Sequence, residues 1–177
     1  MDREFYLKIA EAFIEYDDLP NGWFEYCGMT RRVLVNYNED WVIKLNFSGL
    51  KRNYSGQEYQ NYLSAKEVNL DHYFAEVKYL GELPTGEEVY LQRRCEIDPD
   101  AVGNSFWKYL TGQCGYSEEE ADNEYSELHD DDSIVAVFGE NYKLIDFIND
   151  NEINDLHEEN FGYDENYNPL IIDFAGF

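Results

Sequence analysis

Three polar residues near the end of the chain have the types and spacing that phosphoryl transfer uses. Asp155 is followed five residues later by Asn160, and Asp173 comes directly after the apolar residues 170–172. In phosphoryl transfer to a hydroxyl, one carboxylate orients the hydroxyl and accepts its proton, while an amide oxygen and a second carboxylate hold magnesium against the phosphates. The pattern predicts a catalytic role for Asp155 and metal-ligand roles for Asn160 and Asp173.

These residues also have structural interpretations. Asp155 and Asn160 lie in a stretch rich in Asn and Asp, where such side chains often hold a polar turn by hydrogen bonding to the backbone. Asp173 is harder to explain in this way, because an ionised carboxylate at the end of a core strand needs a partner or a metal. Both interpretations of residues 155–160 stay open at this stage.

The second half of the chain is predicted to be mainly helical. Residues 100–128 have a helical pattern in two pieces around residues 112–115, and residues 133–148 are expected to form one helix with an apolar inner face. A polar loop is expected at 149–168 and a short strand at 170–172.

The first half combines helices with strands. Apolar residues recur at a helical period near the amino terminus, and short β-rich runs joined by compact turns favour antiparallel hairpins. The predicted order is a helix at 3–16, strands at 23–27, 32–37 and 41–47, a helix at 57–71, and strands at 74–80 and 89–94.

The chain is strongly acidic, and the charge is unevenly distributed. Its 177 residues include 38 Asp and Glu against 13 Lys and Arg, a net charge of −25. Direct nucleic-acid binding is therefore not expected, because such binding depends on Lys and Arg neutralising phosphates. Residues 1–94 carry a net charge of −5 and residues 95–177 carry −20, so the two halves differ in electrostatic character.

Composition also predicts a location. No apolar run approaches the roughly 20 residues that a membrane-spanning helix needs, and the acidic amino terminus does not match a secretory signal. The three cysteines, at positions 27, 95 and 114, are widely spaced and form no CxxC pair. These features favour a protein of the reducing cytoplasm without a membrane partner.

Residues 155–160, together with the Asp-Phe-Ala-Gly sequence at 173–176, give the chain a resemblance to a known superfamily. It resembles the protein-kinase-like superfamily, in particular small, divergent proteins related to aminoglycoside and choline phosphotransferases. In this resemblance, residues 155–160 are the catalytic loop and residues 173–176 are a DFG-like metal-binding segment with an inserted alanine.

The resemblance also implies roles for residues of the first half. Gly28 lies in the position of the phosphate-covering loop, and Lys44 on the third strand is the lysine that grips phosphate oxygens. Glu58 in the following helix is the first choice for the ion-pair partner of Lys44, and Glu67 is the second.

A nucleotide-binding hinge is implied where the strand at 89–94 ends. Cys95 and Ile97 would receive the adenine there, and Ile172 is included among the cofactor-binding residues.

Two departures from the superfamily stand out. The phosphate-covering loop has one glycine and is followed by Arg31 and Arg32, where small residues are usual. The chain ends at Phe177, directly after the DFG-like segment, so the resemblance implies a reduced carboxy-terminal lobe without an activation segment.

Together these observations predict an α+β, kinase-like fold with two lobes. Residues 1–98 would form a helix and a five-stranded antiparallel lobe with one internal helix, and residues 99–177 a small helical lobe. The expected function is phosphotransfer from ATP with Mg²⁺ to a hydroxyl of an unknown acceptor. The alternative is a catalytically inactive, pseudokinase-like interaction protein, for example a phage-encoded inhibitor, that binds a basic or nucleic-acid-binding protein.

Overall fold

The structure, a computed structural model, describes residues 2–28, 30–46, 51–125 and 128–175. Contacts within the chain group it into two compact units. Unit 1 comprises Met1–Lys66 and Ala75–Arg94, and unit 2 comprises Glu67–Phe74 and Cys95–Phe177. The division at residues 98 and 99 stays a prediction.

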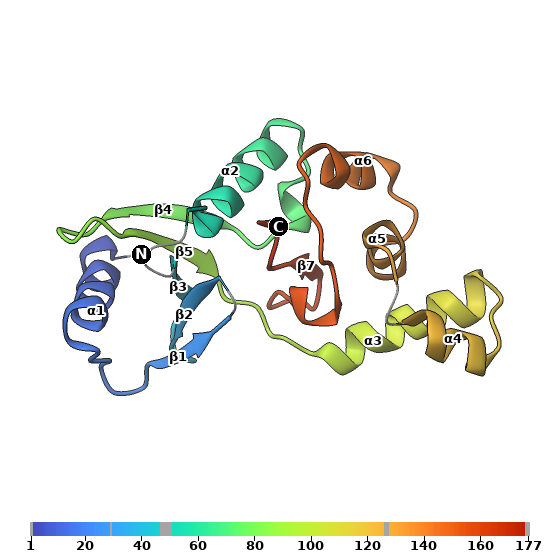
Figure 1. Ribbon diagram of the computed structural model, residues 1–177, viewed down its shortest axis with the longest axis horizontal. Coiled ribbons are helices and arrows are strands. Elements are labelled where there is room, and N and C mark those ends of the chain that lie inside the picture. The colour runs from blue at the N-terminus through green and yellow to red at the C-terminus, as the bar shows by residue number, and fades with distance from the viewer. Residues whose placement is uncertain (1, 29, 47–50, 126–127, 176–177) are drawn as a thin grey trace. The chain divides into compact units, whose positions relative to one another are not determined.

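Unit 1 is built on a five-stranded antiparallel sheet, as predicted (Figure 1). The strand order is β1-β2-β3-β5-β4, so that β3 lies at the centre of the sheet. The end predicted for the third strand, Phe47, lies outside the described residues. The strands are β1 (Phe24–Cys27), β2 (Arg31–Val35), β3 (Trp41–Asn46), β4 (Val77–Glu82) and β5 (Glu88–Arg93).

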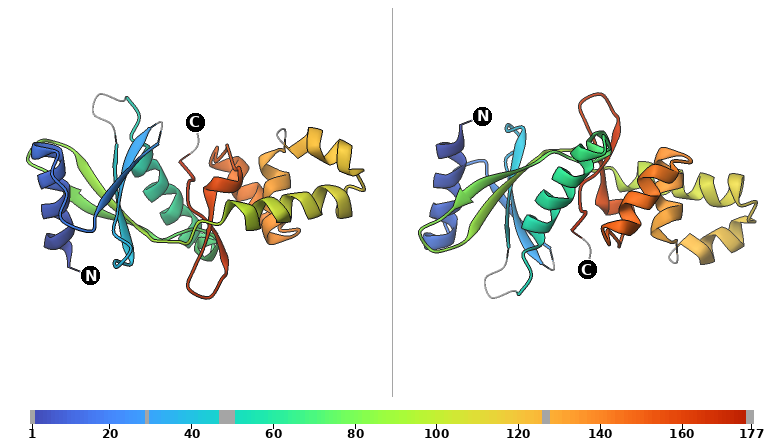
Figure 2. Two further views of the ribbon diagram at one scale, coloured as in Figure 1. Left: turned by 90° about the horizontal axis from the view of Figure 1, so that it is seen from below. Right: turned by 90° about the horizontal axis from the view of Figure 1, so that it is seen from above.

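Helix α1 (Arg3–Tyr16) has the bounds that its apolar period predicts. Asp2 caps it by accepting hydrogen bonds from two backbone amides of the first turn. The helix buries Tyr6, Ile9 and Phe13 in a core shared with the sheet. Figure 2 shows α1 and the second helix, α2 (Tyr54–Glu67), on opposite faces of this sheet.

Helix α2 begins three residues before the predicted start. Asn53 caps it, because Asn53 Oδ1 accepts a hydrogen bond from the Gly56 amide at 2.8 Å. The helix therefore includes Gly56 in its first turn and ends at Glu67 rather than at residue 71. Asn69 has a φ of 59°, a left-handed conformation that separates α2 from the short 3-10 turn Asp71–Tyr73.

Unit 2 begins its long helical section in two pieces, as predicted. Asp98 caps α3 (Pro99–Lys108), which continues into the π-helical turn Tyr109–Gln113. The next helix, α4 (Glu118–Glu124), starts with a capping box between Ser117 and Glu120.

The prediction of one helix over residues 133–148 is wrong. The structure has α5 (Asp130–Phe138) and α6 (Tyr142–Asp150), separated by Gly139 with a φ of 74° and a ψ of −177°. Asn141 then caps α6 through its side chain. The apolar period continues across the break, which is why sequence periodicity alone did not reveal it.

The predicted loop at 149–168 contains a strand that the sequence analysis missed. Strand β6 (Phe161–Tyr163) pairs antiparallel with β7 (Pro169–Ile171). The backbone of Tyr163 also bridges to Glu96, and Ile171 bridges to Phe74. The hairpin is thereby attached to two other segments of unit 2, and Phe161 at its start is fully buried.

The observed architecture confirms the predicted α+β class, with an antiparallel sheet in unit 1 and mainly helices in unit 2. Among the described residues, no helix combines the length and the apolar character needed to span a membrane.

Candidate functional site

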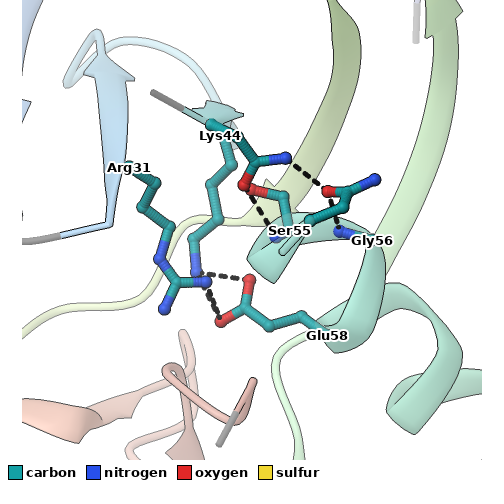
Figure 3. A network of polar contacts seen from close by, with 7 residues as sticks. Arg31, Lys44, Ser55, Gly56 and Glu58 are labelled. Carbon is teal, nitrogen blue, oxygen red and sulfur yellow. Dashed lines mark hydrogen bonds and ion pairs between the residues drawn. The ribbon is translucent and has the colours of Figure 1, made fainter. Parts of the chain in front are cut away.

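Lys44 and Glu58 form the ion pair that the sequence analysis predicted. Along β3, Ile43 and Leu45 are fully buried in the core with α1, so the alternation of a strand directs Lys44 to the other face. Lys44 Nζ donates hydrogen bonds to both carboxylate oxygens of Glu58, each at 2.9 Å (Figure 3). The second choice, Glu67, is not needed to explain the position of Lys44.

Arg31 is a member of this cluster that the sequence analysis missed. Its Nη1 lies 3.1 Å from Glu58 Oε1 (Figure 3). Arg31 begins β2, and Val33, two residues later, pairs with Lys44, so Arg31 and Lys44 emerge on the same face of the sheet. The register between β2 and β3 was the signal from which the position of Arg31 beside Lys44 could have been predicted.

The cluster is almost completely removed from solvent. Glu58 is 0% exposed, Lys44 5% and Arg31 6%. Burial of an ion pair costs desolvation energy, which attraction and hydrogen bonding offset only when the geometry is good. Two cations thus contact one buried carboxylate on the α2 side of the sheet. Hydrophobic residues of similar volume would often give equal or greater stability, so stability alone does not explain this cluster.

A second polar network fixes α2 against the sheet. Asn46, two residues after Lys44 on β3, accepts a hydrogen bond from the Ser55 amide at 3.1 Å and donates through its side chain to Asn53 Oδ1. Asn53 in turn donates to the Tyr90 hydroxyl on β5 at 3.1 Å. The first turn of α2 is thus attached to β3 and β5. This attachment sets the position of Glu58, which follows one turn later in the helix.

Tyr90 and Gly56 complete this network. The Tyr90 hydroxyl donates a hydrogen bond to the Glu88 carboxylate at 2.7 Å. Burial, the larger cause, and this hydrogen bond together raise the pKa of Tyr90 above its ordinary value. A methyl group on Gly56 would lie 2.5 Å from Asn53 Nδ2 and 2.9 Å from the Tyr90 hydroxyl. Any larger residue there would force the side chain of Asn53 or Tyr90 to move, because both approach the helix closely.

Gly28 lies in the turn between β1 and β2. Its amide donates to the carbonyl of Arg31 at 3.0 Å, and a methyl group at this position would make only an ordinary contact with the same carbonyl. The adjacent residue of the predicted phosphate-covering loop, Met29, lies outside the described residues. The geometry of Gly28 is that of a hairpin turn, and a role in covering phosphate stays a prediction.

In unit 2, Asp155 and Asn160 close one compact loop. Asn160 donates through its side chain to the Asp155 carbonyl and through its amide to the His157 carbonyl at 2.9 Å. Asp155 has a left-handed φ of 63°, and its carboxylate is half exposed. The loop therefore combines a backbone hydrogen-bonded turn with a carboxylate that solvent can reach.

Asp173 follows a strand that is attached to this loop. The Ile172 amide donates to the Asn160 carbonyl at 2.9 Å, which brings the segment before Asp173 beside residues 155–160. Phe174, directly after Asp173, is fully buried and packs on Phe74 with ring centroids 5.0 Å apart. Asp173 is thus held at a half-buried position between two anchored residues. Gly176 and Phe177 lie outside the described residues.

Two of the predicted cofactor-binding residues meet at Gly162 in strand β6. A methyl group on Gly162 would lie 2.7 Å from Cys95 Cβ and 3.2 Å from Ile172 Cγ2. Ile97, the third of these residues in unit 2, is 55% exposed. The close approach of Gly162 to Cys95 and Ile172 was missed because this glycine was assigned to a loop.

The oxygen atoms of Asn160 and Asp173 suit a magnesium ion chemically. Magnesium prefers hard oxygen ligands and is usually held by one or two carboxylates with water and phosphate oxygens. Since Asn160 Nδ2 donates to the Asp155 carbonyl, the amide oxygen is the atom of this side chain that can bind a cation. No group of three or more His, Cys, Asp or Glu residues suited to a metal occurs among the described residues.

Comparison with known proteins found a distant likeness to solved structures only. No protein-family model matches the chain, and no curated protein does. Among solved structures, one match is the GDP and kanamycin complex of the aminoglycoside phosphotransferase APH(2")-IIIa, with 15% sequence identity and a TM-score of 0.39. The matched region covers 97% of this chain and 72% of the phosphotransferase chain. A second match is the GDP complex of a mutant aminoglycoside 2'-phosphotransferase-IIIa, with 13% sequence identity and a TM-score of 0.41. This match covers 98% of this chain and 72% of the mutant enzyme's chain. The likeness assigns neither a substrate nor an activity to this chain.

Proposed function

We propose that the chain is a kinase-like phosphotransferase that binds a nucleoside triphosphate, ATP in the first instance, and transfers its terminal phosphoryl group to a hydroxyl. The observation that carries this proposal is the buried contact of Lys44 with both carboxylate oxygens of Glu58 at 2.9 Å. A lysine held in this way at the centre of a sheet has a fixed position, and a fixed ammonium group is suited to neutralising phosphate oxygens.

Unit 1 would supply the phosphate-binding charges. Lys44 binds phosphate oxygens and Glu58 positions Lys44. Arg31 contacts the same carboxylate at 3.1 Å, so it would share the negative charge of Glu58 with Lys44 while Lys44 contacts phosphate oxygens. Arg31 is accordingly a positioning residue, which acts on the nucleotide through Glu58.

Unit 2 would supply the groups for transfer. The acceptor hydroxyl oxygen forms a bond to the terminal phosphorus as the bond between that phosphorus and the nucleoside diphosphate breaks, and Asp155 receives the hydroxyl proton. Asn160 and Asp173 are the residues that would hold Mg²⁺. When bound, the ion neutralises the phosphate charge.

Catalysis is tested by phosphoryl release or transfer from ATP or GTP in the presence of Mg²⁺. Asp155→Asn is expected to abolish turnover and leave nucleotide binding within about threefold of the unmodified protein, because the residue acts on the acceptor. Asp150→Asn, an exposed carboxylate at the end of α6, is the matched control. Equal turnover in the unmodified protein and Asp155→Asn would refute the proposed mechanism.

Asp173→Asn tests the metal-binding role separately. It is expected to weaken the magnesium-dependent part of nucleotide binding, whereas binding measured with excess EDTA should be unchanged. A loss that is equal with and without Mg²⁺ would show that Asp173 acts structurally.

The alternative function, a non-catalytic protein that binds a basic partner, is favoured by the charge of −20 on residues 95–177. One Mg²⁺ ion would offset only two of these charges. A location in the reducing cytoplasm is also part of this proposal. It agrees with the three cysteines, all of which are free thiols. A protein without turnover and without nucleotide affinity at millimolar ATP would support the alternative.

A further inference from the structure

A groove of about 490 Å³ follows one side of α3 within unit 2. Asp100, Gly103, Asn104 and Trp107 line it from α3, and their spacing of three to four residues places them along one face of the helix. Tyr125, at the end of α4, and Glu158, from the segment between Asp155 and Asn160, also line the groove. The groove is open to solvent along its length, so it is a surface site and not an enclosed cavity.

Two aromatic side chains form its walls. The Tyr125 hydroxyl lies so close to α3 that a methyl group on Gly103 would be 2.6 Å from it. Gly103 therefore allows Tyr125 to lie against the helix, where its ring is 6.1 Å from that of Phe106. Trp107 is half-buried one turn further along. Aromatic faces attract cations, and the attraction is stronger for Trp and Tyr than for aliphatic surface.

The groove is also negatively charged. Asp100 and Glu158 line the groove together with Tyr125. Burial and then the charges of Glu158 and Asp100 raise the pKa of Tyr125 above its ordinary value. Neither carboxylate makes an ion pair or a hydrogen bond with another residue in the described ranges 2–28, 30–46, 51–125 and 128–175. Lys108 and Lys143 are the only basic residues of the sequence from 95 to 177, and neither lines the groove.

We propose that this groove binds an arginine side chain of a basic protein partner. A guanidinium group is planar, stacks on aromatic rings and donates several hydrogen bonds in one plane. Trp107 and Tyr125 would contact its faces, Asp100 and Glu158 would accept its hydrogen bonds, and Asn104 Oδ1 would offer another acceptor. An open groove lets the arginine stay attached to its polypeptide, and the acidic surroundings attract a basic segment.

This interaction is independent of the proposed phosphotransfer. Glu158 lies in the segment 155–160, but neither it nor any other groove residue is assigned contact with nucleotide, metal or acceptor, and the interaction requires neither nucleotide nor magnesium. A test without either compound therefore distinguishes failure of this proposal from failure of the proposed function.

The probe is a fluorescein-labelled nine-residue peptide with two arginines in a Gly/Ser background, titrated with the full chain and followed by fluorescence anisotropy. The double variant D100N/E158Q is expected to weaken binding at least tenfold. The control E118Q/E119Q removes the same charge from exposed residues of α4 and should weaken binding less than threefold. Circular dichroism verifies that both variants are folded.

Two further arms test the chemistry of recognition. Trp107→Ala is expected to weaken binding of the arginine peptide at least fivefold, and a peptide with lysine in place of arginine should bind at least threefold more weakly than the arginine peptide. Both expectations follow from stacking and planar hydrogen bonding, which lysine cannot reproduce.

Three results would overturn the proposal. Equal losses in D100N/E158Q and E118Q/E119Q would show attraction by the general negative charge. Binding of arginine methyl ester as tight as that of the peptide would identify a site for small cations. Absence of peptide binding at low ionic strength would show that the groove does not recognise arginine.

Discussion

Glu58 is a buried carboxylate that two cations of unit 1 contact. Lys44 and Arg31 both contact its carboxylate, and all three side chains are nearly inaccessible to solvent. Removal of one partner of a buried ion pair is far more costly than removal of an exposed pair, because the remaining charge cannot be hydrated. The free energy of unfolding should therefore respond strongly to this single carboxylate.

Glu58→Gln is expected to lower the free energy of unfolding by about 3–5 kcal/mol, because Lys44 and Arg31 would lose the buried carboxylate charge that both contact. Glu25→Gln, which breaks the partly exposed ion pair of Glu25 with Arg32, is the control and should cost less than about 1 kcal/mol. Urea unfolding followed by tryptophan fluorescence measures both. Similar losses for the two variants would contradict the account of a buried triad.

The sequence predicted part of this cluster. Lys44 and Glu58 could be paired because the resemblance placed one on the third strand and the other in the next helix. Arg31 was missed because it was assigned to a loop, although strand register places it on the same face as Lys44. Asn46 and Asn53 were missed because their hydrogen bonds depend on how a helix and two strands pack together.

At the scale of elements, the presence of the five strands and the bounds of α1 were predicted well, and breaks within apolar runs were not. Five strands and α1 follow from apolar alternation and period, whereas the division between α5 and α6 depends on the backbone of Gly139. Strand β6 has only three residues, too few for periodicity to identify. The break between α5 and α6 and the strand β6 were therefore missed because each depends on the backbone conformation of very few residues.

Gly56→Ala tests how α2 is attached to the sheet. The added methyl group would collide with Asn53 and Tyr90, so we expect a loss of about 1–3 kcal/mol in the free energy of unfolding. Gly112→Ala, where the added group would contact nothing beyond the neighbouring residues and backbone of its own helix, should be neutral or stabilise by up to about 1 kcal/mol. Thermal or urea unfolding compares the two, and equal effects would contradict the proposed close approach.

The β6–β7 hairpin should respond to acid in a defined direction. Hydrogen bonds from Asn168 and Asn166 lower the pKa of Asp164 below its ordinary value. A carboxyl with a lowered pKa in the folded state stabilises above its unfolded pKa of about 3.9, and this contribution is lost as pH falls through the lower folded pKa. NMR titration should show the amides of Asn166 and Asn168 unchanged until pH falls below about 4. A change in these amide signals above about pH 4, or a change that remains in the variant Asp164→Asn, would contradict the assignment of the titration to Asp164.

At the scale of the whole molecule, the proposed functional residues are divided between two units. Lys44, Glu58 and Arg31 belong to unit 1, and Asp155 and Asp173 belong to unit 2. The charge is divided as well, with −5 on residues 1–94 and −20 on residues 95–177. The proposed reaction requires groups from both units, and the groove along α3 gives the acidic unit a separate role.

Hydrogen exchange should reveal whether both units respond to one nucleotide. ATP with Mg²⁺ is expected to slow amide exchange in α2 of unit 1 and in residues 155–160 of unit 2. In Asp173→Asn, protection of α2 should remain and protection of residues 155–160 should be reduced. Protection confined to one unit of the unmodified protein would contradict a function that uses both.

The central claim is that Lys44, held by Glu58, binds the phosphates of a nucleotide. Calorimetric titration of ATP with Mg²⁺ into the unmodified protein, Lys44→Met and the control Lys66→Met, an exposed lysine at the end of α2, tests it directly. We predict measurable binding to the unmodified protein and to Lys66→Met, and at least tenfold weaker binding to Lys44→Met with the fold retained by circular dichroism. No binding to the unmodified protein at millimolar ATP, or equal binding to all three proteins, would contradict the claim.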